Sequence, residues 1–183
     1  CNLCCSYCRG KEFGEIQKDE DPIIPQIEID PELPPDLNYD LSLLYNFLKK
    51  DPSATLTFYG GEPLMRADLI NTIVHDAPVQ RFMIQTNGTL LNRLSPGTMN
   101  RFSTVLVSID GQENITDANR GIGTYRQVIT NIETIRRNGF EGEIIARMTV
   151  TENTDIREAV HWLSKNPDCS FSSIHWQLDA NFS

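Results

Sequence analysis

Two periodicities alternate along most of this chain. Five segments alternate apolar and polar side chains with the period of two that is typical of strands: 54–59, 81–86, 103–110, 143–151 and 172–179. Four other segments repeat apolar residues at spacings of three and four, which indicates amphipathic helices: 41–48, 69–73, 125–135 and 156–163. Gly139 is expected to end the third helix, and Asp155 to cap the start of the fourth. Strands that alternate with helices predict βαβ units and a parallel sheet, and therefore an α/β fold.

Each predicted strand has one apolar face and one face that becomes polar toward its carboxyl end. In 143–151, for example, Ile144 and Ala146 oppose Arg147 and Thr149. A doubly wound sheet would be apolar on both faces. The pattern therefore favours a barrel or half-barrel, with helices outside and polar residues converging at the carboxyl mouth, where barrel active sites lie. An open α+β sheet with one face in solvent is the alternative.

Length and charge narrow the class of protein. The 183 residues are enough for one domain, and no apolar run has the length of a membrane span. Sixteen basic against twenty-five acidic residues give a net charge of −9, which argues against nucleic-acid and anionic-membrane partners. Residues 9–40 are acidic and proline-rich and are expected to form an extended connection within the domain. Because the chain begins at Cys1 and not at Met, we expect either that a leader is missing or that the chain is a piece of a longer protein.

Four of the five cysteines fall within the first eight residues. Such close neighbours make a poor disulfide framework, and in an intracellular protein they favour metal or redox chemistry. Cys1/Cys4 and Cys5/Cys8 could form a zinc site, but zinc ligand pairs are normally separated by a dozen residues or more. A Cys-x2-Cys redox pair is a second reading. The third is Cys1-x3-Cys5-x2-Cys8, in which three thiolates hold three corners of a [4Fe–4S] cluster and leave the fourth iron open. Cys169 is expected to be a small buried residue.

Three further motifs come at the ends of predicted strands. In Thr57–Pro63, two glycines allow a close approach of the backbone to a ligand, and Glu62 offers a carboxylate. Gln85–Gly88 follows the next strand, and both this motif and Gly60–Pro63 could instead be simple turns. Val107–Gly111 places Ser108 and Asp110 on one face, which would suit the hydroxyls of a ribose. Neither a Gly-x-Gly-x-x-Gly nor a Walker sequence is present, so Rossmann and P-loop functions have no support.

Taken together, these motifs resemble those of the radical S-adenosylmethionine (SAM) enzymes, closest to the peptide- and protein-modifying branch that includes anaerobic sulfatase maturases. The resemblance covers nearly the whole chain in order: CNLCCSYC at 1–8, FYGGEP at 58–63, QTNGTL at 85–90, VSIDG at 107–111, NRG at 119–121 and GTY at 123–125. Each motif alone is weak to moderate, and the ordered set is specific. The resemblance implies a partial (β/α)6 TIM-like barrel, of which 1–183 is a truncated core without the first strand.

The resemblance also implies roles for individual residues. Cys1, Cys5 and Cys8 would ligate a [4Fe–4S] cluster whose open iron binds SAM, with Cys4 as a bystander. The SAM contacts would come from Tyr7 at the adenine, from Gly60, Gly61 and Glu62 at the methionine amino group, and from Ser108 and Asp110 at the ribose or methionine end. Asn87 and Gln177, together with Gln85 and His175, would line the cofactor and substrate side. Strand alternation, and not the resemblance, suggests Arg147 as a partner for the SAM carboxylate.

The chemistry implied is reductive cleavage of SAM to methionine and a 5′-deoxyadenosyl radical, which abstracts hydrogen from a substrate. We expect an anaerobic, cytoplasmic oxidoreductase-type enzyme that acts on a peptide or protein and takes electrons from a low-potential flavodoxin- or ferredoxin-type donor. A small-molecule substrate, or a non-catalytic zinc- or metal-binding module, is the alternative. His75 and His161 are expected to be structural or surface groups, and Arg120 a residue that stabilises a turn.

Overall fold

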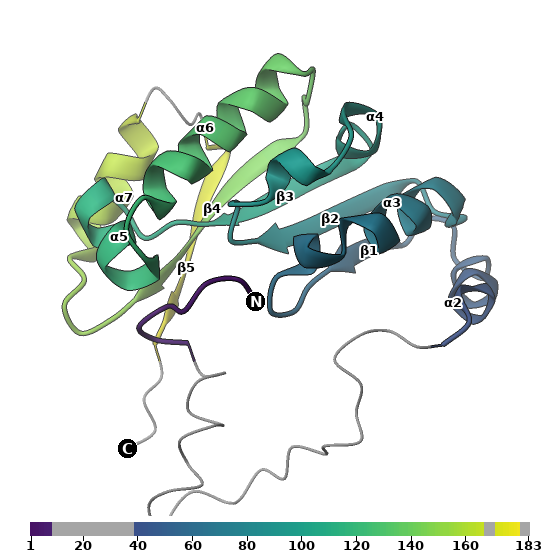
Figure 1. Ribbon diagram of the computed structural model, residues 1–183, viewed down its shortest axis with the longest axis horizontal. Helices are drawn as coiled ribbons and strands as arrows, with labels where there is room; N and C mark the ends of the chain where they lie inside the picture. Colours follow the sequence, from purple (N-terminus) through teal and green to yellow (C-terminus); the bar gives the residue numbers. More distant parts are fainter. Residues whose placement is uncertain (9–38, 167–170, 180–183) are drawn as a thin grey trace, which may run out of the picture.

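The sheet is built of five parallel strands. The computed structural model describes residues 1–8, 39–166 and 171–179 (Figure 1). The strands are β1 (Thr55–Phe58), β2 (Arg81–Thr86), β3 (Phe102–Ser108), β4 (Glu143–Val150) and β5 (Ser173–Leu178), and they lie in the sheet in sequence order. The predicted α/β class and parallel sheet are therefore confirmed. Cys169 and nearly all of the predicted connection 9–40 lie outside the described residues.

The helices confirm the four predicted amphipathic segments. They are α2 (Leu41–Leu48), α3 (Ala67–Asp76), α6 (Thr124–Arg137) and α7 (Ile156–Lys165). The Asp155 side chain accepts a hydrogen bond of 2.9 Å from the Glu158 amide and caps α7, as predicted. Gly139, with φ of +91°, follows α6. None of the helices within the described ranges has the length and apolar character needed to cross a bilayer.

The sequence pattern missed four short elements. They are the 3-10 helices η1 (Pro63–Arg66) and η2 (Leu91–Arg93) and the α-helices α4 (Pro96–Met99) and α5 (Glu113–Arg120). In α5, Ile115 is the one strongly apolar residue, so the sequence has no apolar repeat that would indicate this helix. Polar segments of this kind form helices through tertiary contacts that periodicity cannot predict.

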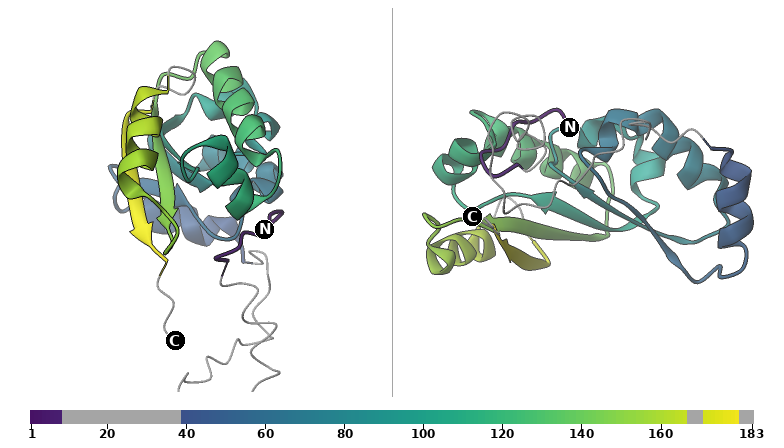
Figure 2. Two further views of the ribbon diagram at one scale, coloured as in Figure 1. Left: turned by 90° about the vertical axis from the view of Figure 1, so that its left-hand side faces the viewer. Right: turned by 90° about the horizontal axis from the view of Figure 1, so that it is seen from below.

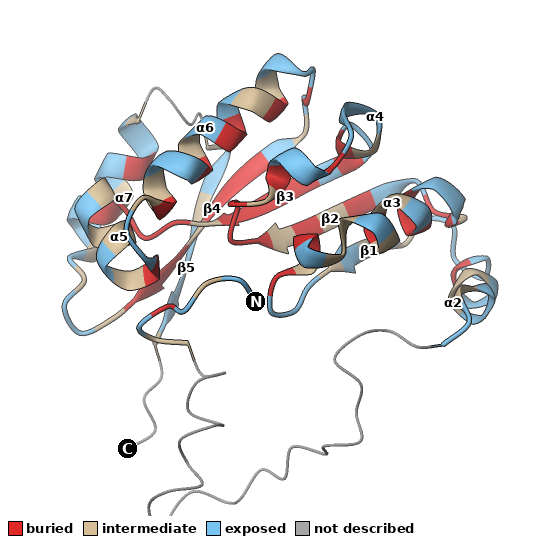
Figure 3. Cartoon of the chain, viewed as in Figure 1, coloured by how far each residue is buried: buried red, intermediate tan, exposed pale blue. Residues whose placement is uncertain are grey.

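One face of the sheet is covered by helices. The central strands β2, β3 and β4 contribute fully buried side chains: Phe82, Ile84, Val105, Val107, Ile144, Ala146 and Met148. These pack in one cluster with Ile73 of α3, Val128 and Ile132 of α6, and Leu163 of α7. Figure 3 shows the buried positions running along the central strands and the inner sides of the helices. The sheet is strongly twisted and curved, as Figure 2 shows, which is consistent with a partial barrel.

The prediction of an apolar, covered face was wrong for β5. Trp176 is 54% exposed and Leu178 is 66% exposed, whereas Ile174 of the same face packs partly against the core. The reason is the position of the strand. β5 lies at the edge of the sheet and pairs only with β4, so within the described part of the chain its outer half has few neighbours.

Gly88 gives a first testable prediction, because it turns the chain directly after β2. Its φ is +79°, and a Cβ placed there would lie 2.9 Å from Val107 Cγ1 and 3.2 Å from a Val128 methyl group. We expect Gly88→Ala to lower the free energy of unfolding by about 2–4 kcal/mol, because left-handed strain and overpacking add. Urea unfolding measures this loss.

Gly123→Ala is the matched control. Gly123 has a similar φ of +83°, but no described atom lies within 4 Å of an added Cβ. That variant should lose only the backbone contribution of about 1–2 kcal/mol. Equal losses for the two variants would show that the contact with Val107 and Val128 has no energetic weight.

Candidate functional site

The predicted motifs meet at the carboxyl edge of the sheet, because parallel strands end on the same side. Residues 1–8 lie against this edge (Figure 1). The Asn2 amide donates to Thr89 Oγ1 at 3.0 Å, and the Asn87 amide donates to Asn2 Oδ1 at 2.8 Å. Farther along, the Ser6 backbone N–H donates to the Asn119 carbonyl at 2.8 Å. The structure thus brings the cysteine segment together with the ends of β2 and α5.

The four described cysteines have different surroundings. Cys5 is buried, Cys8 is half-buried, and Cys1 and Cys4 are exposed. The Cys8 N–H donates to the Cys5 carbonyl at 3.1 Å, which closes a turn between these two residues. Burial raises the pKa of the Cys5 thiol, and the Arg120 guanidinium opposes that shift. Cys5 is therefore the cysteine most enclosed by the protein.

Gly61 and Asn87 lie beside the first cysteine, which is exposed. A Cβ at position 61 would lie 3.3 Å from the Cys1 nitrogen and 3.5 Å from the Cys1 Cβ, so the absence of a side chain lets the two segments approach. Gly60, with a φ of +154°, has no described atom within 4 Å of such a Cβ. The Asn87 amide nitrogen lies 3.9 Å from Cys1 Sγ and directs a hydrogen bond to it. Hydrogen bonds to cluster sulfurs are one of the means by which proteins set reduction potentials.

The donor set of the cysteine loop consists of thiols, the ligand type that iron–sulfur clusters use. Within residues 1–8, 39–166 and 171–179, no three Cys, His, Asp or Glu side chains converge around one point. A structural zinc ion needs four ligands at about 2.0–2.3 Å from one centre. Cluster thiolates bind separate irons and so stand farther apart. Three cysteines on one anchored loop suit the second arrangement.

Glu62 is a buried carboxylate that links two strand ends. One oxygen, Oε1, accepts hydrogen bonds from the Leu64 N–H at 3.0 Å and from Thr86 Oγ1 at 2.8 Å. The other, Oε2, accepts from the Asn87 N–H at 2.7 Å. A carboxylate has about four lone-pair positions, so these three bonds leave room for about one more donor. Contact of Glu62 with the SAM amino group stays a prediction.

Asp110 and Arg120 form a buried ion pair. Asp110 is fully buried and Arg120 is 6% exposed. The Arg120 Nε donates to Oδ2 and its Nη2 to Oδ1, both at 2.9 Å. The Tyr7 hydroxyl also donates to Oδ2, at 2.7 Å, and the Thr149 N–H to Oδ1, at 3.0 Å. The structure thus surrounds the Asp110 carboxylate with protein donors, which strand alternation did not predict, and contact with a ribose stays a prediction.

Electrostatics in this network favour one protonation pattern. Burial raises the pKa of the Tyr7 hydroxyl, which therefore keeps its proton and donates it to Asp110. Burial alone would lower the pKa of Arg120, but the charge of the Asp110 carboxylate raises it. The Arg120 guanidinium lies 5.4 Å from the centre of the Tyr7 ring. The Arg120 guanidinium therefore keeps its charge beside the Asp110 carboxylate.

A row of polar residues crosses the uncovered face of β3, β4 and β5. Ser108 pairs in register with Arg147, and Arg147 with His175. The Arg147 Nη2 donates to Oε1 of Gln177, which lies one row nearer the carboxyl edge. Gln85 of β2 pairs with Leu106 of β3, two residues before Ser108. Strand alternation therefore placed Ser108, Arg147 and Gln177 on a common face correctly, and their contacts with SAM stay predictions.

Sequence reasoning missed several residues that build the site. Thr86, Asn2, Asn119 and Arg120 all contact predicted site residues through hydrogen bonds. Arg120 was assigned only to a turn, although it closes α5 and reaches back to Asp110. Its place in the NRG motif at 119–121 was the available signal. His75, in contrast, is an exposed helix residue whose ring bonds Asp76 at 2.6 Å.

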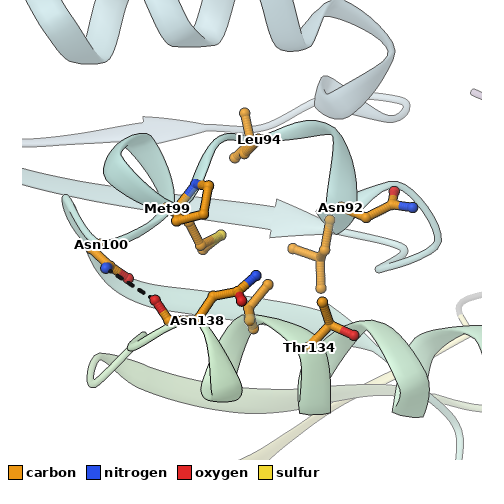
Figure 4. Close-up of a pocket in the computed structure, with 9 residues that line it drawn as sticks. Asn92, Leu94, Met99, Asn100, Thr134 and Asn138 are labelled. Atoms are coloured by element: carbon orange, nitrogen blue, oxygen red, sulfur yellow. Dashed lines mark hydrogen bonds between the residues drawn. The ribbon is translucent and has the colours of Figure 1, made fainter.

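One cavity lies elsewhere in the molecule. A cavity of about 120 Å³, lined in part by Leu91, opens between η2, α4 and α6, with Leu94 and Met99 on one wall and Thr134 and Asn138 on another (Figure 4). The Asn100 amide donates to the Asn138 carbonyl at 3.5 Å across its edge. None of the motif residues line it. It is separate from the cysteine segment.

Comparisons with curated proteins find two relatives at low identity. Proteins named AdoMet-dependent heme synthase, from Oleidesulfovibrio alaskensis and Nitratidesulfovibrio vulgaris, are 27% identical over 157 and 162 residues, which cover 81% of this chain. The chain spans only 36% and 38% of the length of these relatives.

Solved structures share the fold. Native anSMEcpe with bound AdoMet has a TM-score of 0.67 at 19% identity, and the match covers 99% of this chain and 49% of that one. Streptococcus suis SuiB bound to precursor peptide SuiA has a TM-score of 0.58 at 15% identity, with 98% and 37% covered. The family model described as the Radical SAM superfamily matches residues 1–163, which is most of the sequence. This chain therefore belongs to the radical SAM superfamily.

Proposed function

We propose that this chain is the core of a radical SAM enzyme that binds a [4Fe–4S] cluster through Cys1, Cys5 and Cys8 and abstracts hydrogen from a peptide or protein. The observation that carries the proposal is the attachment of the cysteine segment to the ends of β2 and α5. This attachment presents three thiols at the edge where polar strand ends gather, which is where barrel folds place their chemistry.

Cys1, Cys5 and Cys8 would hold the cluster, and the cluster and SAM would together supply one-electron reductive cleavage of the SAM sulfonium. The protein holds the ligands and orients SAM. Gly61 leaves room beside Cys1, and Glu62 has about one lone-pair position left for the SAM amino group. Arg147, held by Gln177, offers a guanidinium to the SAM carboxylate, and Ser108 lies beside it in register. A low-potential flavodoxin- or ferredoxin-type protein would supply the electron.

A peptide or protein substrate is supported by the solved neighbours. The anSMEcpe structure with bound AdoMet and the Kp18Cys peptide matches at a TM-score of 0.66, and SuiB was solved with its precursor peptide SuiA. The names of the curated relatives favour a second candidate, a small molecule, because those heme synthases match at the higher identity of 27%. The reaction core proposed above is the same in both cases.

Anaerobic reconstitution with iron and sulfide tests the cofactor proposal. The reduced protein should give a cluster EPR signal that changes when SAM is added. Cys1→Ala, Cys5→Ala and Cys8→Ala should each abolish the signal, because each removes one of three thiolates. Cys4→Ala is the matched control within the same loop and should keep the signal.

The same variants separate the alternatives. Zinc uptake without a cluster signal, or loss of the signal in Cys4→Ala, would contradict the proposed ligand set. Formation of 5′-deoxyadenosine can then be followed with a library of cysteine-containing peptides and with an iron porphyrin. Stimulation by the porphyrin alone would favour the small-molecule candidate.

A further inference from the structure

The buried pair of Asp110 and Arg120 has no assigned step in the proposed reaction. Removing two charges from water is costly, so a buried ion pair is weak evidence for stability by itself. The pair does have demanding geometry: the planar guanidinium binds both carboxylate oxygens, each at 2.9 Å. Such a two-point contact fixes the orientation of the carboxylate, and any other group that binds the carboxylate depends on that orientation.

The group that depends on it is the cysteine loop. The Tyr7 hydroxyl donates to Asp110 Oδ2 at 2.7 Å, and the Tyr7 ring lies beside the Arg120 guanidinium. The residue before Arg120 in the chain, Asn119, accepts from the Ser6 N–H at 2.8 Å, and the Asn119 side-chain oxygen lies 3.3 Å from Ser6 Oγ. Ser6 and Tyr7 are the two residues between Cys5 and Cys8. Ser6 is therefore bonded directly to the end of α5, and Tyr7 is connected to it through Asp110 and lies beside Arg120.

The other end of the loop is attached separately. Cys1 and Asn2 are held by Gly61, Asn87 and Thr89, which follow β1 and β2. Within the part of the chain that the structure describes, neither Asp110 nor Arg120 forms a hydrogen bond with Cys1 or Asn2. The loop thus has two independent attachments, and the pair governs the one that carries Cys5 and Cys8.

We propose that Arg120 is a positioning residue for the cluster, which acts through Asp110 and Tyr7 to hold the Cys5–Cys8 turn in place before metal binds. The proposal rests on the ligand set Cys1, Cys5 and Cys8 proposed above. A loop fixed in advance loses less conformational freedom when its thiolates meet the cluster, so it binds the cluster more tightly. Arg120 need not touch the cluster or SAM to have this effect.

Alkylation of the metal-free protein under anaerobic conditions tests the proposal. Cys5 is buried, so it reacts with iodoacetamide only when the turn opens, whereas Cys1 is exposed. Tyr7→Phe keeps the ring and removes the bond to Asp110, a charge-assisted bond whose loss corresponds to about a tenfold increase in opening. We expect Cys5 to be alkylated about tenfold faster in Tyr7→Phe and in Arg120→Lys, with Cys1 unchanged. Peptide mass spectrometry resolves the two sites.

The rate of iron loss from the reconstituted protein provides a second measurement. A chelator should remove iron about tenfold faster from Tyr7→Phe than from the unchanged protein, for the same reason. Arg126→Lys is the matched control, because Arg126 forms an exposed ion pair with Glu113 far from the cysteines in sequence, and it should change neither rate.

The outcomes are distinguishable. An unchanged Cys5 rate in Tyr7→Phe, or equal acceleration of Cys1 and Cys5, would overturn the proposal, and Tyr7→Phe decides the matter if Arg120→Lys does not fold. A failure of the unchanged protein to assemble any cluster would overturn the proposed function instead, and the alkylation result would stand by itself.

Discussion

Asp110→Ala should lower the free energy of unfolding by about 3–5 kcal/mol, because it leaves the buried Arg120 guanidinium without its counter-charge. The substitution also removes the acceptor for the Tyr7 hydroxyl and for the Thr149 N–H. Burial opposes the charged form of Arg120, and Asp110 is the main group that compensates for it. Chemical denaturation with urea measures the loss.

A double variant separates charge from packing. Asp110→Ala combined with Arg120→Met removes both charges, and it should recover part of the stability that Asp110→Ala loses. Glu113→Ala is the comparison at the surface, because its partner Arg126 is 78% exposed. That variant should cost less than about 1 kcal/mol. If Asp110→Ala lowered the free energy of unfolding no more than Glu113→Ala does, the buried pair would not have the predicted effect on stability.

Glu62→Ala should lower the free energy of unfolding by about 3 kcal/mol. It removes the acceptor of three hydrogen bonds and leaves the buried N–H groups of Leu64 and Asn87 unsatisfied. Glu62→Gln keeps the size of the side chain but presents an NH2 group to a donor, so it should lose about half as much. Asp155→Ala is a matched control, since Asp155 is also a helix-capping carboxylate, but an exposed one with a cost of about 1 kcal/mol.

The Glu62 variants also test the cofactor role. In Glu62→Gln, we expect the iron content after reconstitution to be retained and the affinity for SAM to fall, because the three thiolates are unchanged. Isothermal titration of SAM into the reconstituted variant measures this fall. Loss of iron would instead assign Glu62 mainly to holding the cysteine segment, through Asn87 and its contacts with Asn2 and Cys1.

The sequence predicted the regular part of the fold well. Strands and helices with apolar faces repeat at fixed spacings, and these spacings marked β1 to β5 and the longer helices. The predicted burial was wrong for Trp176 and Leu178 of β5. Alternation predicts which face of a strand is apolar, but not whether another element covers that face.

The candidate site was predictable only in part, for a related reason. Motifs marked residues at strand ends, and parallel topology brings such ends together. The network of Asp110, Arg120 and Tyr7 joins residues that are 10 and 103 positions apart, and polar contacts of this kind have no period along the chain. Asp110 was therefore found as a candidate, whereas the partners that surround it were not.

Asp110 also takes part in the end of the pairing between β3 and β4. The register between β3 and β4 ends at Ser108 and Arg147, with one more backbone bond from the Ile109 N–H to the Arg147 carbonyl. Beyond that point the chain of β3 turns away, and the Asp110 side chain accepts the Thr149 N–H that the next backbone carbonyl would otherwise bind. At the end of the β3–β4 pairing, the Asp110 side chain thus replaces a backbone carbonyl as the hydrogen-bond acceptor. The last link between these two strands consequently depends on the type of one side chain, whereas the links before it depend only on the backbone.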